Sequence, residues 1–160
     1  MMNYKHFSTA LIALSLSACG GGGGGGGSDT PDTRPVGSAD GKAQHGPIQN
    51  AAISAYNWNG SQGQFFASTT SDSEGRYSLA LGVSSTDMLI ASSGGQYPEE
   101  SNGRSVSMGE EDGLKAVIHY EQGKSVSVQL TYFTTLAACR AEYLVGTGIN
   151  AGTAITQANN

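Results

Sequence analysis

Apolar and polar residues alternate through the middle of the chain with the two-residue period of β-strands. Tyr77, Leu79 and Leu81 are the clearest example, because they alternate with Arg, Ser and Ala directly after a predicted tight turn at residues 72–75. The same period predicts further strands at residues 51–56, 63–69, 114–120 and 125–132, and a short apolar run predicts another at 88–91. Residues 121–124 predict a hairpin between the last two strands. Short strands that share one apolar face must bury it, so we expect two antiparallel sheets packed face to face.

Past this region the period becomes helical. Residues 133–146 begin with threonines suited to cap a helix and end in glycine. Leu136, Cys139 and Tyr143 recur at helical spacing and therefore share an apolar face of this helix. A second helix is predicted at about residues 150–158.

The N-terminus has the pattern of an export signal. A polar start with Lys5 precedes an apolar run at residues 7–16, which is shorter than the roughly 20 residues of a membrane helix but suits a signal peptide. The run ends in Leu-Ser-Ala-Cys at residues 16–19, which resembles the lipobox of bacterial lipoproteins. This resemblance implies that residues 1–18 are removed and that Cys19 carries acyl chains, palmitate among them, which hold the protein on a membrane.

Glycine accounts for 24 of the 160 residues, and one uninterrupted run occupies residues 20–27. No strand precedes this run and no Gly-Lys-Ser/Thr follows it, so it is not a phosphate-binding loop. Residues 19–40 are therefore predicted to be the lipidated cysteine and a flexible linker. By the lipoprotein resemblance, Gly20 in place of an aspartate favours the outer membrane of the cell envelope over retention at the inner membrane.

The composition narrows the class of partner. Lysine and arginine number 8 against 13 acidic residues, which gives a net charge of −5. Nucleic-acid binding requires a basic face, so we exclude a nucleic-acid partner. Charged residues make up only 13% of the chain, a proportion that suits an extracytoplasmic β domain.

Two segments resemble carboxypeptidase regulatory-like domains, which are transthyretin-like β-sandwiches. Residues 46–56 are similar to that family's approach to its second strand, and residues 69–79 are similar to its Thr-Asp-x-x-Gly-x-Tyr/Phe-x-Leu turn and strand. The resemblance spans about residues 42–130. The family's first strand is reduced here to Asp-Gly-Lys-Ala-Gln at residues 40–44.

The chain is thus predicted to be mainly β, an Ig-like or transthyretin-like antiparallel β-sandwich with a short C-terminal helical segment. Its expected parts are the signal peptide (1–18), the lipidated cysteine and linker (19–40), the sandwich (41–132) and the helical segment (133–160). Similar helices follow such sandwiches in longer bacterial lipoproteins. We therefore hypothesise that the chain is a fragment or truncated product of a longer protein.

Residues able to carry catalysis are few. His45 and His119 are the histidines outside the signal peptide, and Cys139 is the thiol left after acylation of Cys19. We expect Cys139 to be a small buried residue of the first helix, and we expect neither a Cys-His catalytic pair nor a zinc site. The chain is predicted to be no enzyme, to hold no metal or cofactor, and to form no disulfide.

The acidic residues have structural explanations. Asp72 and Glu74 lie in a predicted β-turn, and Leu81 stands where a calcium loop would need its bidentate acid. A long loop at residues 96–113 carries five further acids. We expect them to keep this edge of the sheet solvated and so to prevent it from pairing with another sheet. These acids are Glu99, Glu100, Glu110, Glu111 and Asp112.

Aromatic residues are the candidates for ligand contact. Tyr56 and Trp58 flank a predicted loop and are able to stack on a sugar or a peptide. The sequence therefore predicts a lipid-anchored, non-catalytic envelope protein whose sandwich serves as a binding or spacer module, with an unknown carbohydrate or protein ligand. The alternative is the accessory domain of an envelope enzyme, such as a peptidase, whose catalytic part lies elsewhere.

Overall fold

A computed structural model describes residues 36–160 of the chain. The predicted signal peptide, Cys19 and the linker as far as residue 35 lie outside these described residues. No helix among the described residues is long and apolar enough to cross a membrane.

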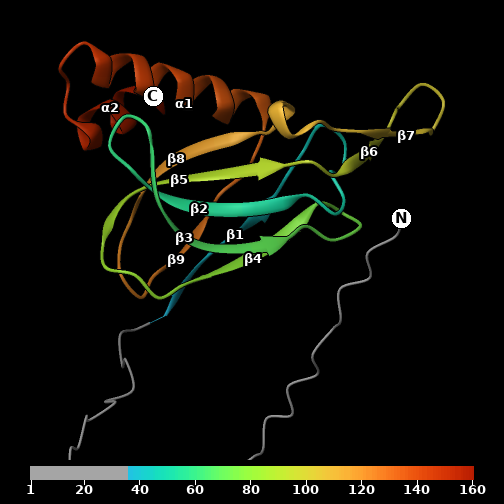
Figure 1. Cartoon of the computed structure of the whole chain (residues 1–160), viewed down its shortest axis with the longest axis horizontal. Helices are drawn as coiled ribbons and strands as arrows, with labels where there is room; N and C mark the ends of the chain where they lie inside the picture. Colours follow the sequence, from blue (N-terminus) through green and yellow to red (C-terminus); the bar gives the residue numbers. More distant parts are fainter. Residues whose placement is uncertain (1–35) are drawn as a thin grey trace, which may run out of the picture. The chain divides into compact units, whose positions relative to one another are not determined.

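Two β-sheets and a pair of helices form three layers (Figure 1). The outer sheet contains, in spatial order, β4 (Arg76–Leu81), β1 (Gly37–Lys42) and β9 (Ser125–Ser127). The middle sheet contains β3 (Gln62–Thr70), β2 (Ala52–Trp58), β5 (Thr86–Ser93) and β8 (Lys115–Tyr120). The helices α1 (Tyr132–Gly146) and α2 (Ala151–Ala158) pack on the far face of the middle sheet. The predicted mainly β sandwich with a C-terminal helical segment is confirmed.

The main core lies between the two sheets. The two-residue period directs the side chains on one side of each strand into it. In β4, Tyr77, Leu79 and Leu81 are buried while the residues between them are exposed, as predicted. Ile53 in β2 and Ile90 in β5 face them from the middle sheet. Burial of such side chains stabilises the fold by about 1.5–3 kcal/mol each.

The first strand begins earlier than the sequence indicated. β1 starts at Gly37, so residues 37–40, which were predicted to belong to the linker, form part of the outer sheet. β1 is antiparallel to β4 and parallel to β9, a departure from the all-antiparallel sandwich that we expected. Polar residues alternate with glycine and alanine in β1, so the period-two hydrophobic signal is too weak to mark it.

The predicted hairpin at residues 121–124 is wrong. A turn does close there, with the amide of Lys124 donating to the carbonyl of Glu121 at 3.1 Å. However, β8 pairs with β5 in the middle sheet whereas β9 pairs with β1 in the outer sheet. The chain crosses between the sheets because β8 and β9 bury their apolar sides in the same core from opposite sheets. Local alternation shows which side of a strand is buried, but it does not show which strand is its neighbour. The final strand is also shorter than predicted, because α1 begins at Tyr132.

A second core lies between the middle sheet and the helices. Its sheet side is formed by Trp58, Leu89 and Val117, and its helix side by small or aliphatic residues: Ala138, Ala141, Ala154, Ile155 and Ala158. The predicted burial of Cys139 is wrong, because Cys139 is exposed. Leu136 and Tyr143, which share its apolar face, are also 68% and 72% exposed. Alanines allow the helix to approach the sheet closely, so α1 buries its small-residue side.

The predicted long loop at residues 96–113 contains regular structure. It forms a hairpin of β6 (Gln96–Pro98) and β7 (Ser105–Ser107), followed by the 3₁₀ helix η1 (Glu110–Asp112). Figure 1 shows this hairpin projecting from the end of the sandwich at which α1 begins. The acidic residues of this segment are exposed, as expected for a solvated edge.

Candidate functional site

Three aromatic rings from distant parts of the chain meet at one end of the sandwich. His45 lies in the turn after β1, Tyr97 in β6, and Tyr132 at the first position of α1. The ring of His45 lies edge-to-face against both tyrosines, with centroid distances of 4.6 Å to Tyr97 and 4.8 Å to Tyr132. We call these three residues the aromatic cluster. Such edge-to-face pairs are attractive because a positive ring edge meets a negative ring face.

Backbone hydrogen bonds on either side of His45 bring the two tyrosines to it. The amide of Gln44 donates to the carbonyl of Leu130 at 2.8 Å, which holds the chain close to the start of α1. Gln49 and Gln96 exchange two backbone hydrogen bonds, of 2.8 and 3.0 Å, which bind the same turn to β6. Strand register and turn geometry thus position the aromatic cluster.

Two cavities flank the cluster, and acidic residues line both. The first, of about 390 Å³, is bordered by His45, Tyr97, Glu99 and Glu100 among its lining residues. The second, of about 330 Å³, lies on the other side, where Tyr97 and Tyr132 form part of its wall. Its acidic lining residues are Glu111 and Asp112. Tyr97 therefore lines two hollows that each combine aromatic and acidic residues.

Local hydrogen bonds orient two of these four carboxylates. The side chain of Asn102 donates to Glu99 at 2.6 Å across the β6–β7 turn, and the amide of Gly109 donates to Asp112 at 3.0 Å. His45 and all four acids are exposed, Tyr132 is 51% exposed and Tyr97 is half-buried. Aromatic faces and carboxylates both attract cations, so the arrangement suits an organic cation such as a lysine or arginine side chain.

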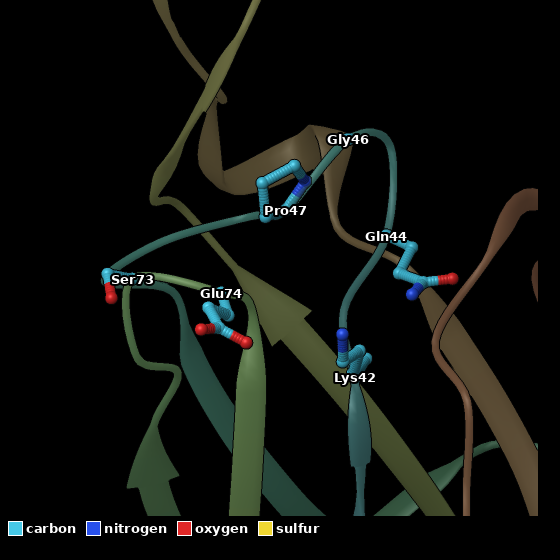
Figure 2. Close-up of a pocket in the computed structure, with 6 residues that line it drawn as sticks. All are labelled: Lys42, Gln44, Gly46, Pro47, Ser73 and Glu74. Atoms are coloured by element: carbon cyan, nitrogen blue, oxygen red, sulfur yellow. The ribbon is translucent and has the colours of Figure 1, made fainter.

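A third hollow adjoins the first through Gly46. It has a volume of about 460 Å³ and is lined by Lys42, Gln44, Gly46, Pro47, Ser73 and Glu74 (Figure 2). Lys42 and Gln44 rise from the end of β1, while Ser73 and Glu74 come from the turn before β4. Opposite charges lie on its two sides, and Glu74 also pairs with Arg76. The hollow therefore has no net electrostatic preference of the kind found at the acidic cavities.

The turn before β4 is the predicted β-turn. One carboxylate oxygen of Asp72 accepts hydrogen bonds from the amides of Arg76 and Glu74, both at 2.8 Å, and these bonds hold the pKa of the Asp72 carboxyl below its ordinary value. Gly75 has a φ of 73°, a conformation that glycine adopts without strain. The acids of this turn therefore have a structural role.

The two predicted ligand residues lie away from the aromatic cluster and differ from each other. Trp58 is 2% exposed in the second core, so the prediction that it contacts a ligand is wrong. Its indole nitrogen has no hydrogen-bond partner among the described residues. Tyr56 is half-buried, packs edge-to-face on Phe65 at 5.8 Å, and lines a hollow of about 170 Å³ on the middle sheet.

The potential catalytic groups are dispersed. His119 pairs with Asp87, with 2.8 Å between Nδ1 and a carboxylate oxygen, on the side of the middle sheet that carries the helices. Within residues 36–160, no hydrogen bond joins Cys139 to His45 or to His119. In the same part of the chain, no three His, Cys, Asp or Glu side chains are grouped as a metal ion would require.

Sequence reasoning noted His45 and the acidic loop but missed the aromatic cluster. Tyr97 lies in a segment predicted to be loop, and Tyr132 was predicted to end a strand. No local pattern links three residues so far apart in the chain. The usable signal was the concentration of acidic residues around Tyr97.

Comparison with known proteins leaves the family of this chain open. No protein-family model matches the chain, and no curated protein matches it. Among solved structures, a 9R-lipoxygenase from Cyanothece PCC8801 is weakly similar, with a TM-score of 0.34 and 11% sequence identity. The similarity covers 79% of this chain and 25% of the lipoxygenase chain, and at this strength it carries no argument about activity.

Proposed function

We propose that this protein is a non-catalytic, lipid-anchored component of the bacterial envelope whose β-sandwich is a binding module. The aromatic cluster, open to solvent between two acid-lined cavities, is the observation that supports this function. Loops at the end of a rigid sandwich commonly carry binding residues, because the sheets hold them in place.

The chemistry of the site favours a basic protein segment as the ligand. A lysine or arginine side chain would place its charge over a tyrosine face and near the carboxylates of Glu99 and Glu100. A neutral sugar would gain from ring stacking but not from the acidic residues. We therefore place protein ligands that carry exposed basic residues ahead of carbohydrates.

The anchor rests on the residues around Cys19. Their resemblance to a lipobox and the adjacent glycine run together favour acylation at the outer membrane. β1 begins at Gly37, so residues 20–36 would join the lipid to the sandwich. A Gly-rich segment of that length spans roughly 20–25 Å on average.

Peptide and glycan arrays test the ligand class, using the full chain with Cys19→Ser so that it remains in solution without lipid. We expect retention of peptides rich in lysine or arginine and no retention of neutral peptides or glycans. The affinity should fall with added salt, because exposed charge interactions are screened.

Variants connect that binding to the site. Tyr132→Ser and Glu99→Gln should each lower the affinity for a retained basic peptide by roughly two- to fivefold, the value of one exposed cation–π or ionic contact. Glu121→Gln, an exposed acid in the turn after β8, is the matched control and should bind as the unmodified chain does. Equal affinities in all variants, or a preference for glycans, would contradict the proposed site.

The anchor needs its own test. Cells that produce the full chain and are fed a fatty-acid analogue should label the protein, and Cys19→Ser should abolish the label. Labelling of both proteins to the same extent would refute acylation at Cys19 and would leave the ligand site unaffected.

A further inference from the structure

Helix α1 is apolar on two opposite sides. Its inner side, with Ala138 and Ala141 fully buried, packs on the middle sheet. Its outer side presents Phe133, Leu136 and Tyr143, which are 84%, 68% and 72% exposed. Soluble helices ordinarily place polar residues on the side that faces water.

The exposed apolar residues form a continuous band. Positions 133, 136, 139 and 143 are spaced by three or four residues, so their side chains lie on one face of the helix. Cys139 is exposed in the middle of this band. We call Phe133, Leu136, Cys139 and Tyr143 the outer stripe.

We infer that the outer stripe is the interface of a homodimer, in which α1 packs antiparallel against α1 of a second copy. This interface is separate from the proposed ligand site, and neither depends on the other. A two-fold contact uses the same surface on both subunits, so the surface must be complementary to itself.

The stripe has that property. Aromatic residues lie at both ends, Phe133 and Tyr143, and the smaller Leu136 and Cys139 lie between them. With a two-fold axis through the middle of the stripe, Phe133 of one copy faces Tyr143 of the other at each end. The two Cys139 thiols then lie near the axis, between helices whose axes are about 8–10 Å apart.

The available area is sufficient for a weak dimer. Exposed aromatic side chains contribute roughly 150–200 Å² each, so the stripe offers on the order of 450 Å² per copy. The flanking Arg140 is also exposed and raises the total for two copies above about 1,000 Å², the lower bound for a specific interface. The dimer should therefore depend on protein concentration.

A lipid surface fits the stripe less well. Helices that lie on anionic membranes carry several basic residues on the polar side, whereas α1 has one arginine and one glutamate, Arg140 and Glu142.

Cysteine cross-linking in cells that produce the full chain tests the interface. Oxidation with copper phenanthroline should yield a disulfide-linked dimer on non-reducing gels. Cys139→Ser should remove this dimer, and Phe133→Asp should reduce it at least tenfold while retaining Cys139. Val36→Asp is the matched control, because Val36 is an exposed apolar residue directly before β1 of the outer sheet. This variant should cross-link as the unmodified chain does.

Sedimentation equilibrium provides a second measurement that does not require a thiol. The purified chain with Cys19→Ser should shift from monomer to dimer between about 1 and 100 µM, and Phe133→Asp should remain monomeric with an unchanged melting temperature, because Phe133 lies outside both cores.

Three results would overturn the inference. The first is a monomer at all concentrations without a Cys139-dependent cross-link. The second is a dimer that Phe133→Asp leaves intact. The third is a monomer that instead sediments with phosphatidylethanolamine and phosphatidylglycerol vesicles through the outer stripe.

Discussion

The hydroxyl of Tyr120 donates a hydrogen bond to the carbonyl of Leu81 at 2.9 Å and thereby joins the two sheets of the sandwich. Tyr120 is the last residue of β8 in the middle sheet, and Leu81 is the last residue of β4 in the outer sheet. The same hydroxyl accepts a bond of 3.2 Å from the amide of Gly123, in the turn that carries the chain across to β9. One buried side chain therefore fixes the point at which the chain changes sheets.

Removal of this hydroxyl should weaken the sandwich. Tyr120→Phe leaves buried backbone groups without a partner, and we expect a loss of about 1–2 kcal/mol in the free energy of unfolding, measured by urea denaturation. Tyr132→Phe is the control, because Tyr132 is 51% exposed and lies outside both cores, and its free energy of unfolding should change by less than about 0.5 kcal/mol. Equal effects of the two substitutions would show that the Tyr120 bond contributes nothing.

The pairing of β1 with β9 depends on a glycine. A Cβ atom at Gly41 would lie 1.8 Å from the carbonyl oxygen of Val128, so Gly41→Ala must move one backbone away from the other. We expect a destabilisation of at least about 1–3 kcal/mol, measured as a shift of the urea midpoint. Gly82→Ala has nothing within 4 Å of the new atom and should leave the midpoint nearly unchanged or slightly higher. A stable Gly41→Ala protein would contradict the observed parallel pairing.

A buried serine holds the chain before β2. The hydroxyl of Ser71 donates to the carbonyl of Ile48 at 2.7 Å and accepts from the amide of Ala51 at 2.9 Å, and Ser71 is 2% exposed. Ser71→Ala should cost about 1–3 kcal/mol, because both backbone groups lose their partner away from water. The nearby exposed Ser73→Ala should cost less than about 0.5 kcal/mol. Thermal unfolding followed by circular dichroism would compare the two variants directly.

Acid should destabilise the protein through two aspartates. Hydrogen bonds from Ser38 and Ser78 lower the pKa of the Asp40 carboxyl, and backbone amides lower that of Asp72. A carboxyl whose folded pKa is lowered adds stability above its ordinary value of 3.8, and this contribution is lost as the pH falls through the folded pKa.

Asp72→Asn tests that relation, since the amide oxygen still accepts hydrogen bonds but does not titrate. The variant should be less stable than the unmodified chain at pH 7, and the difference should shrink towards pH 3. Urea unfolding at several pH values measures the gap. A gap that stays constant, or widens in acid, would contradict a lowered pKa of Asp72.

Burial of Tyr77 also bears on its chemistry. The phenol lies in the main core and donates to the carbonyl of Val128 at 2.6 Å. Burial, together with the negative charge of Asp40, raises the pKa of this phenol above its ordinary value. Spectrophotometric titration should therefore show a component that ionises only after alkaline unfolding, and Tyr77→Phe should reduce that late component by one tyrosine.

Local patterns determined much of this fold. Two-residue alternation placed Tyr77, Leu79 and Leu81 on the buried side of β4, because a strand exposes every second side chain to one face. The same rule located β2, β3 and β8, a short apolar run located β5, and the change to helical spacing located α1. Alternation predicted the strands but did not specify their partners, so the sequence alone joined β8 and β9 in a false hairpin.

Only the tertiary structure decided which surfaces are buried and which residues meet. Both sides of α1 are apolar, and the alanine side packs on the sheet because small residues allow close approach, which leaves Phe133, Leu136 and Tyr143 outside. The same packing encloses Trp58. His45, Tyr97 and Tyr132 are brought together by backbone bonds between remote segments, a relation that a local pattern cannot contain. Local sequence patterns determined most of the elements, and long-range packing decided the surfaces available for function.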